Sequence, residues 1–354
     1  MNDTINHTIE SLVIPSQQQT LKELGVTCQV NLQNDIIKIE LNAGFPLSLI
    51  ETEIDAAIGG IARELGQHGQ IKLMYTSQIR PHLCQLPGQM LKGVKNTIAV
   101  ASGKGGVGKS TVSVNLACAL AKRGARVGIL DADIYGPSLP TMLGGRQPVT
   151  LDGDFYQPIV AHGVQAMSMG YLSHDEQALI WRGPMLAKAL VQMLNITQWD
   201  NLDYLIIDLP PGTGDIQLSL VQKIPLAGAI VVSTPQNVAL ADAQKALNMF
   251  TKTNIPLLGV VENMSIHTCS ACGHQEAIFG EQGLGELSQQ YQVPILAKLP
   301  LDKSIQSDCD KGHPTALKEN PLADQFLALA TNVCLQLSRR PLGYQDRMPP
   351  VVQG

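Results

Sequence analysis

The hydrophobic pattern of the chain changes near residue 96. From there onward, short apolar runs alternate with segments whose apolar residues recur at helical spacing. The runs are nearly continuous and often β-branched, which is typical of strands buried on both faces. They lie at Thr97–Ala101, Val127–Leu130, Tyr204–Ile207, Ala229–Ser233, Leu257–Val261 and Ile295–Leu299. Helical segments such as Ser110–Arg123 and Leu240–Lys252 separate most of them. We therefore predict an α/β fold whose mostly parallel sheet is covered by helices on both faces.

The first 80 residues follow a different pattern. Val26–Leu32 and Ile36–Leu41 alternate apolar and polar residues around Asn34-Asp35, which predicts a β-hairpin. Leu47–Leu65 has apolar residues at helical spacing, and Ile71–Tyr75 is a further short strand. We expect a small α+β domain at 1–80, a linker at 81–95, a larger domain at 96–338 and a Pro-rich tail at 339–354.

Composition narrows the class of protein. The chain has 354 residues, of which 44% are hydrophobic and 16% charged, so a sizeable core is available. Its formal net charge of −5 argues against a general affinity for nucleic acid, since that affinity depends on Lys and Arg neutralising phosphates. No apolar stretch approaches the ~18 residues that span a bilayer, and the first residues lack the pattern of a signal peptide. We expect a cytoplasmic protein that binds neither nucleic acid nor membranes.

A glycine-rich segment carries the clearest chemical signal. It is Gly103-Lys104-Gly105-Gly106-Val107-Gly108-Lys109-Ser110-Thr111, between a predicted strand and a predicted helix. Glycines allow several backbone N–H groups to converge on one anion, and the helix N-terminus adds its dipole. Lys109 can then reach the β- and γ-phosphates of a nucleotide, and the Ser110 hydroxyl can ligate magnesium. The segment predicts a P-loop that binds ATP and Mg²⁺.

The same glycines also fit a dinucleotide-binding fingerprint, and Asp131 lies about where a ribose-binding acid is expected. Lys109-Ser110 favour the P-loop, because a dinucleotide site does not need them. Asp208, at the end of the apolar run Tyr204–Ile207, fits the Walker B carboxylate of a P-loop enzyme. Asp131 and Asp133 have a simpler alternative, since carboxylates are common at solvated strand ends.

Lys104 is a second lysine in the loop and lies outside the minimal Walker A pattern. Here the chain resembles the deviant Walker A ATPases, which include MinD, ParA, the nitrogenase iron protein and the arsenite-pump ATPase. The resemblance implies that Lys104 contacts nucleotide across a homodimer interface. It also implies that Asp133 belongs to switch I and positions the attacking water, that Asp208–Asp215 forms switch II, and that Asn263 contacts adenine.

Cys269 and Cys272 are the only cysteines close together in the sequence, with His267 before them and His274 after them. Four interpretations of this pair compete. They are a dithiol redox motif, a structural disulfide, a zinc site completed by the two histidines, and an iron–sulfur cluster. A cluster needs four thiolates, and two copies of the pair on a two-fold axis supply them.

A narrower resemblance follows from these motifs taken together. The motifs are Gly103–Thr111, Leu130–Ser138, Trp181–Pro184, Asp208–Asp215 and Glu262–Ser265 followed by Cys269 and Cys272. They resemble the Mrp/ApbC iron–sulfur cluster carriers. That resemblance implies a homodimeric ATPase that binds a labile 4Fe-4S cluster through Cys269 and Cys272 and transfers it to apoproteins. The rival functions are a ParA/MinD-type positioning ATPase, a nucleotide-dependent reductase and a zinc-stabilised ATPase dimer.

The first 90 residues resemble the small domain of the MIP18 family, which is often fused in front of such ATPases. Members of that family often have Cys-Pro where this chain has Phe45-Pro46. A cysteine-dependent role of the N-terminal domain is therefore not expected at this position.

Overall fold

The computed structural model describes residues 2–33, 36–65, 70–86, 89–134, 136–145, 147–172, 183–281 and 283–342. The chain forms two compact units, which we describe separately: Met1–Arg80 with Cys334–Arg340, and a larger unit that begins at Pro81. Trp181, Arg182 and the tail beyond residue 342 lie outside the described residues. No helix in the described part of the chain is both long enough and apolar enough to cross a membrane.

A single eight-stranded sheet forms the centre of the larger unit. Its order is β10 (Ile159–Ala161), β11 (Val164–Ser168), β7 (Val127–Asp131), β12 (Leu202–Asp208), β6 (Val94–Ala101), β13 (Gly228–Ser233), β14 (Leu257–Glu262) and β17 (Ile295–Lys298). Only β10 is antiparallel to its neighbour. All six predicted strands are present, and every residue of β12 is buried, as expected of a strand covered on both faces. The pair β10–β11 was not predicted: β10 has three residues and none of them is buried, whereas β11 has five residues of which four are buried.

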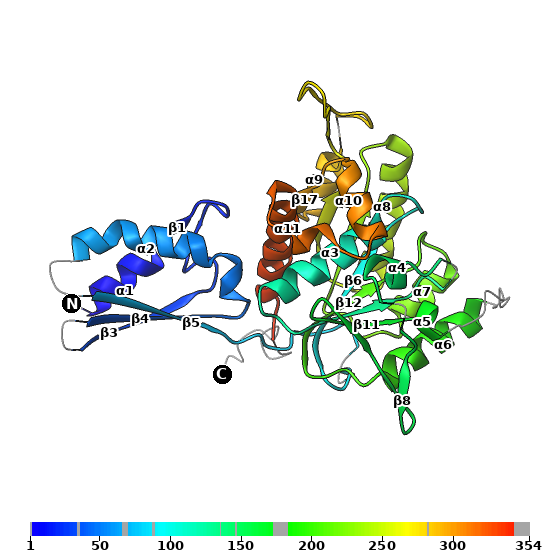
Figure 1. The fold of residues 1–354 in the computed structure, drawn as a ribbon, viewed down its shortest axis with the longest axis horizontal. Coiled ribbons are helices and arrows are strands. Elements are labelled where there is room, and N and C mark those ends of the chain that lie inside the picture. Colours follow the sequence, from blue (N-terminus) through cyan, green and yellow to red (C-terminus); the bar gives the residue numbers. More distant parts are fainter. Residues whose placement is uncertain are drawn as a thin grey trace, which may run out of the picture. The chain divides into compact units, whose positions relative to one another are not determined.

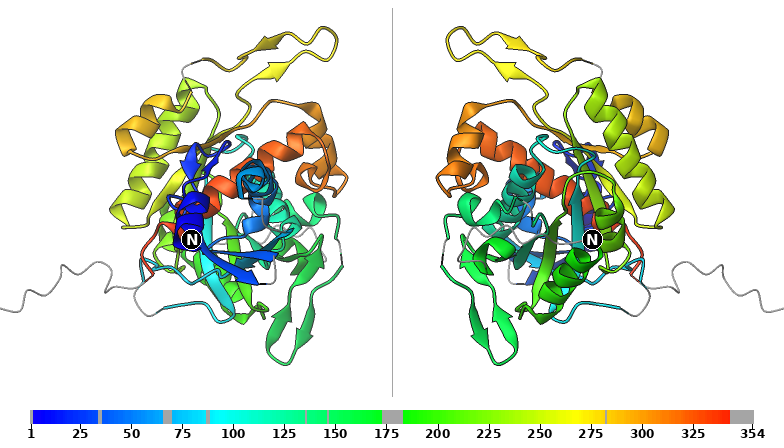
Figure 2. Two further views of the ribbon diagram at one scale, coloured as in Figure 1. Left: turned by 90° about the vertical axis from the view of Figure 1, so that its left-hand side faces the viewer. Right: turned by 90° about the vertical axis from the view of Figure 1, so that its right-hand side faces the viewer.

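Helices cover both faces of this sheet (Figures 1 and 2). The helices α6 (Gly183–Ile196), α7 (Asp215–Val221) and α8 (Asn237–Lys252) share one hydrophobic cluster with the strands. The helix α3 (Lys109–Lys122) and α11 (Pro321–Ser338) lie on the opposite side in Figure 1. The predicted fold class is confirmed. The remaining elements are α4 (Leu139–Met142), β8 (Thr150–Asp152), β9 (Phe155–Gln157), α5 (Met169–Leu172), β15 (His267–Thr268), β16 (Gln275–Glu276), α9 (Gly285–Tyr291), α10 (Lys303–Asp310) and η2 (Thr315–Leu317).

The parallel arrangement places the candidate site residues on one edge of the sheet. The strands β6, β7, β12 and β14 end at Ala101, Asp131, Asp208 and Glu262. Their carboxyl ends lie together because the strands are parallel. Ligands of open α/β sheets bind in the crevice outside these ends. The glycine-rich loop, both predicted switch segments and Asn263 all follow directly after these strands.

The smaller unit is built around a three-stranded sheet, β3-β4-β5. Its elements are α1 (Asn2–Glu10), β1 (Val13–Ile14), β2 (Gln19–Thr20), β3 (Thr27–Gln33), β4 (Ile36–Ala43), η1 (Leu47–Leu49), α2 (Glu51–Leu65) and β5 (Gln70–Ser77). The strands β3 and β4 form the predicted antiparallel hairpin. The predicted helix begins at Glu51, because Leu47–Leu49 form a separate 3₁₀ turn after Pro46. Phe45 is fully buried, so a core side chain occupies the place of the cysteine.

Residues that follow Arg80 are hydrogen-bonded to the larger unit. The backbone N–H of His82 donates to Asn96 Oδ1 over 3.0 Å. The side-chain amide of Gln85 donates to the carbonyls of Val221 and Ile224 over 2.9 and 2.7 Å. The strand β6 then begins at Val94.

Candidate functional site: a phosphate loop and an exposed thiol pair

Two glycines of the loop are required by the close approach of their neighbours. A Cβ atom on Gly103 would lie 2.1 Å from the backbone carbonyl of Asp242 in α8. A Cβ atom on Gly108 would lie 2.2 Å from Asn263 Nδ2, and Gly108 also has a φ of 82°. The loop therefore lies directly against α8 and the segment after β14. This packing fixes its shape at the N-terminus of α3, where backbone N–H groups favour an anion.

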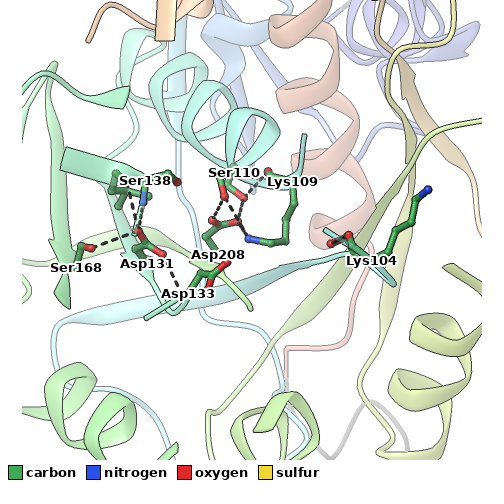
Figure 3. Close-up of polar contacts among 11 residues, drawn as sticks. Lys104, Lys109, Ser110, Asp131, Asp133, Ser138, Ser168 and Asp208 are labelled. Atoms are coloured by element: carbon green, nitrogen blue, oxygen red, sulfur yellow. Dashed lines mark hydrogen bonds and ion pairs between the residues drawn. The ribbon is translucent and has the colours of Figure 1, made fainter. Parts of the chain in front are cut away.

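Lys109, Ser110 and Asp208 form a compact cluster, called here the buried cluster, in which Lys109 and Asp208 are buried and Ser110 is half-buried (Figure 3). Lys109 Nζ lies 2.8 Å from Asp208 Oδ1, and the two side chains are 6% and 0% exposed. The Ser110 hydroxyl donates to Asp208 Oδ2 over 2.6 Å. The Ser113 hydroxyl donates to Asp208 Oδ1 over 2.6 Å. The structure thus brings together the Walker A lysine, the Walker A serine and the Walker B carboxylate that were predicted from separate segments.

The oxygen atoms of this cluster fit a magnesium ion. Mg²⁺ prefers oxygen ligands and is usually bound by one or two carboxylates together with phosphates and water. The Ser110 hydroxyl and the Asp208 carboxylate offer such oxygens side by side at the start of the P-loop helix. The donor set therefore agrees with the predicted metal.

Asp131 is buried beside this cluster and organises the segment that follows β7. Its carboxylate accepts hydrogen bonds from the backbone N–H groups of Asp133, Ser138 and Leu139 over 3.0–3.3 Å, and from the Ser168 hydroxyl over 3.3 Å. Burial, followed by the charge of Asp208 on the paired strand, raises the pKa of Asp131 to about 7. The alternative of a solvated strand end does not apply to Asp131, which is 1% exposed.

Asp133 is half-buried, and its backbone is fixed by Asp131. Figure 3 shows both aspartates next to Asp208. A carboxylate at this position lies near the place where the phosphates of a nucleotide are expected. Its predicted role in positioning water stays a prediction.

Lys104 points away from the buried cluster (Figure 3). Its Nζ atom donates to Gln236 Oε1 over 3.3 Å, and its side chain is only half-buried. The contact with a nucleotide bound by another chain, which the resemblance implies for Lys104, stays a prediction.

Asn263 follows β14 and lies against the P-loop. Its Nδ2 atom donates to the carbonyl of Val107 over 2.8 Å, and its own backbone N–H donates to Ser233 over 2.8 Å. The side chain is 7% exposed. Asn263 therefore supports the P-loop directly, and the implied contact with adenine stays a prediction.

Cys269 and Cys272 lie at the tip of the β15–β16 hairpin. Figures 1 and 2 show that this hairpin, coloured gold, projects from the larger unit. Cys269 is half-buried and Cys272 is exposed. The backbone N–H of Ala271, then that of Cys272, and the Cys272 thiol lower the pKa of the Cys269 thiol. The turn thus stabilises the thiolate, which is the form that binds metals.

The hairpin offers a soft metal only this pair of thiols from one chain. Within the described ranges, no three or more His, Cys, Asp or Glu side chains lie close enough together to hold a metal ion. The Nδ1 atom of His267 lies 3.2 Å from the carbonyl of Leu301, and His274 is exposed. A zinc site made by both histidines and both cysteines of one chain is therefore not formed.

Comparison with known proteins shows the family of the chain. The family model described as ParA: NUBPL iron-transfer P-loop NTPase matches residues 93–334, well over half of the chain. The chain belongs to this family. The iron-sulfur cluster carrier protein of Escherichia coli (strain K12) is 55% identical over 336 residues, which are 93% of this chain and 90% of the relative.

Solved structures confirm the fold of the family. A nucleotide-binding protein from Archaeoglobus fulgidus in complex with ADP is 38% identical, covering 62% of this chain and 87% of its own, with a TM-score of 0.56. MinD from Pyrococcus horikoshii with Mg-ADP is 26% identical, covering 66% of this chain and 94% of its own, with a TM-score of 0.52. The family model and the curated relative confirm the predicted resemblance to the iron–sulfur cluster carriers, and they do not favour the positioning ATPase.

Three polar residues of the site were not predicted from the sequence. Ser113, Ser168 and Gln236 bond to Asp208, Asp131 and Lys104, respectively. The sequence does indicate that Ser113 could join the site, because it lies one helical turn after Lys109 and on the same face of an otherwise apolar helix. Ser168 and Gln236 had no local signal, since their partners are distant in the sequence.

Proposed function

We propose that this iron-transfer P-loop NTPase hydrolyses ATP, binds a labile 4Fe-4S cluster between two copies of the chain, and transfers the cluster to apoproteins. The observation that carries the proposal is the accessible pair of thiols of Cys269 and Cys272, which has no third ligand beside it among the described residues, on a fold with a phosphate loop. The curated relative from Escherichia coli is itself named an iron-sulfur cluster carrier protein.

In this proposal the residues of the buried cluster, together with Asp133 and Asn263, act on ATP. Lys109 leaves Asp208 and places its charge on the β- and γ-phosphates, where negative charge develops during phosphoryl transfer. Asp133 orients the attacking water. Ser110 and Asp208 hold Mg²⁺, which, when bound, neutralises charge on the phosphate oxygens. Asn263 keeps the loop in shape through Val107 and lies at the adenine.

A second copy of the chain completes both sites. Lys104 reaches from one copy to the nucleotide of the other, which makes dimerisation dependent on nucleotide. A cubane cluster takes four thiolates, and two hairpins on a two-fold axis supply four. Homodimerisation thus explains both the second lysine and the incomplete ligand set.

Transfer follows from ligand exchange at iron. A thiol of the acceptor protein binds iron as its thiolate, the iron–sulfur bond to a hairpin cysteine breaks, and the proton of the acceptor thiol passes to the released thiolate. No electron is gained or lost in this exchange. The exposure of Cys272 gives an acceptor direct access to the cluster.

Anaerobic reconstitution of the full chain with iron and sulfide tests the proposal. Cys269→Ser and Cys272→Ser are expected to lose the visible absorption of the cluster and the ability to activate an apo acceptor protein. Cys84→Ser is the matched control, because Cys84 is also partly exposed but its thiol donates to the carbonyl of Leu86 over 3.0 Å. A cluster that survives in Cys269→Ser contradicts the proposal. Bound zinc without a cluster in the wild type favours the zinc-stabilised dimer instead.

A further inference from the structure

The thiol-bearing hairpin is too small to fix its own orientation. Its strands have two residues each. Within the hairpin, the backbone N–H of Cys269 donates to His274 over 2.9 Å, and that of Gly273 donates to Cys269 over 2.9 Å. An isolated two-stranded hairpin is at best marginally stable in water. The direction in which the thiols point must therefore be set where the hairpin joins the rest of the unit.

That junction is made by the segment Leu299–Leu301 after β17. The Leu301 N–H donates to the carbonyl of Ile266 over 2.9 Å, and the backbones of His267 and Leu301 form a parallel bridge. The His267 ring adds a side-chain contact, since its Nδ1 atom lies 3.2 Å from the Leu301 carbonyl. A carbonyl can only accept, so Nδ1 carries the proton in this contact. His267 is thus the hairpin side chain that closes the junction.

A series of hydrogen-bonded residues leads from the P-loop to this junction. Asn263 donates to Val107 in the loop over 2.8 Å. Ser265 follows and is tied to Leu299 twice, by its backbone N–H over 2.9 Å and by its hydroxyl over 3.0 Å. His267 comes two residues later and Cys269 two residues after that. One short, hydrogen-bonded segment therefore connects the nucleotide loop with the first thiol.

We propose that His267 is a positioning residue that couples the nucleotide site to the thiol pair. A change of the P-loop on nucleotide binding shifts Asn263, the segment transmits the shift to the junction, and His267 turns the hairpin with it. Without the His267 ring contact, only the backbone contacts of Ile266 and His267 with Leu301 hold the junction, and we expect the thiols to lose their response to nucleotide. The inference rests on the proposed function, because it assigns the coupling between ATP and the cluster to a named contact.

The chain offers matched variants for a test. His267→Ala removes the donor to Leu301. His267→Asn keeps a side-chain N–H donor close to the position of Nδ1. His274→Ala removes a histidine from the other side of the same hairpin, where the ring is exposed. A residue that only stabilises the fold would not distinguish these three variants by their response to nucleotide.

The experiment measures how fast bipyridyl removes iron from the reconstituted full chain, with and without a non-hydrolysable ATP analogue. In the wild type, His267→Asn and His274→Ala, we expect the analogue to change the rate by about fivefold or more, the lower end of ordinary coupling between two sites. In His267→Ala we expect a change below about twofold. Because coupling between two sites is reciprocal in equilibrium binding, bound cluster should also change the affinity for the analogue in the wild type and not in His267→Ala, by a factor that need not equal the ratio of rates.

A second measurement does not need the cluster. The rate at which a maleimide alkylates Cys272 in the apoprotein, followed by peptide mass, should respond to the analogue in the wild type and His267→Asn but not in His267→Ala. The inference is overturned if His267→Ala keeps the wild-type response in either assay, or if the wild type shows none. Failure of the wild type to bind any cluster contradicts the proposed function instead, and the alkylation assay still decides the role of His267.

Discussion

Replacement of Lys109 by alanine should destabilise the nucleotide-free protein as well as abolish nucleotide binding. The Lys109 amine lies 2.8 Å from a carboxylate that is 0% exposed, so the substitution leaves Asp208 buried with only the hydroxyls of Ser110 and Ser113. Breaking a buried ion pair by removing one partner costs about 3–5 kcal/mol. That is a large part of the ~5–15 kcal/mol by which a typical domain is stable.

At about 2–4 °C for each kcal/mol in a domain of this size, the midpoint of thermal unfolding should fall by about 6–20 °C. The double variant Lys109→Ala/Asp208→Asn removes the unpaired charge and should recover most of the loss. Neither variant should bind ATP, because both lack the charge that contacts the phosphates. Circular dichroism follows unfolding without nucleotide, and calorimetry follows binding. The reasoning is refuted if the single variant is as stable as the wild type, or if Asp208→Asn destabilises it further.

Three further predictions concern the same edge of the sheet. Because the pKa of Asp131 rises from 3.8 to about 7 on folding, the folded state keeps its proton longer, and stability should fall by up to about 1.4 kcal/mol per pH unit between about pH 4 and 7. Urea unfolding from pH 4 to 8 should show this slope up to about pH 7 in the wild type and a flatter one in Asp131→Asn, and equal slopes would contradict it. Gly103→Ala forces a Cβ atom to within 2.1 Å of the Asp242 carbonyl and should lower the unfolding midpoint, whereas Gly105→Ala, with 4.0 Å to its nearest neighbour, should not. Similar midpoints for both glycine variants would show that the loop relaxes freely. Lys104→Ala should bind ATP as a monomer but fail to dimerise with a non-hydrolysable analogue in sedimentation, and a normal dimer would remove Lys104 from the interface.

The sequence predicted the parts of the fold whose signal is local. Strands of a parallel sheet that are buried on both faces have nearly continuous apolar residues, as in Tyr204–Ile207. This local pattern was therefore enough to predict the positions of these strands. The edge strand β10 was not predicted because it has only three residues and its central residue, Val160, is 69% exposed. The P-loop was predicted because its function needs fixed spacing within nine residues.

Contacts between distant segments could not be predicted in the same way. His267 was considered as a zinc ligand because Cys269 and Cys272 are its neighbours in the sequence. Its ring instead faces Leu301, 34 residues later, and nothing in the local pattern indicates that pairing. Lys109 shows the same limit, since the motif predicts its phosphate contact but not its burial against Asp208.

The iron content and mass of the reconstituted full chain test the central claim most directly. In the proposed dimer each chain contributes Cys269 and Cys272, so native mass spectrometry under anaerobic conditions should show two chains with one 4Fe-4S cluster, or about two irons per chain. The same measurement on Cys272→Ser should show no cluster. A cluster bound to a single chain, or about four irons per chain in the dimer, would contradict a site shared between two copies.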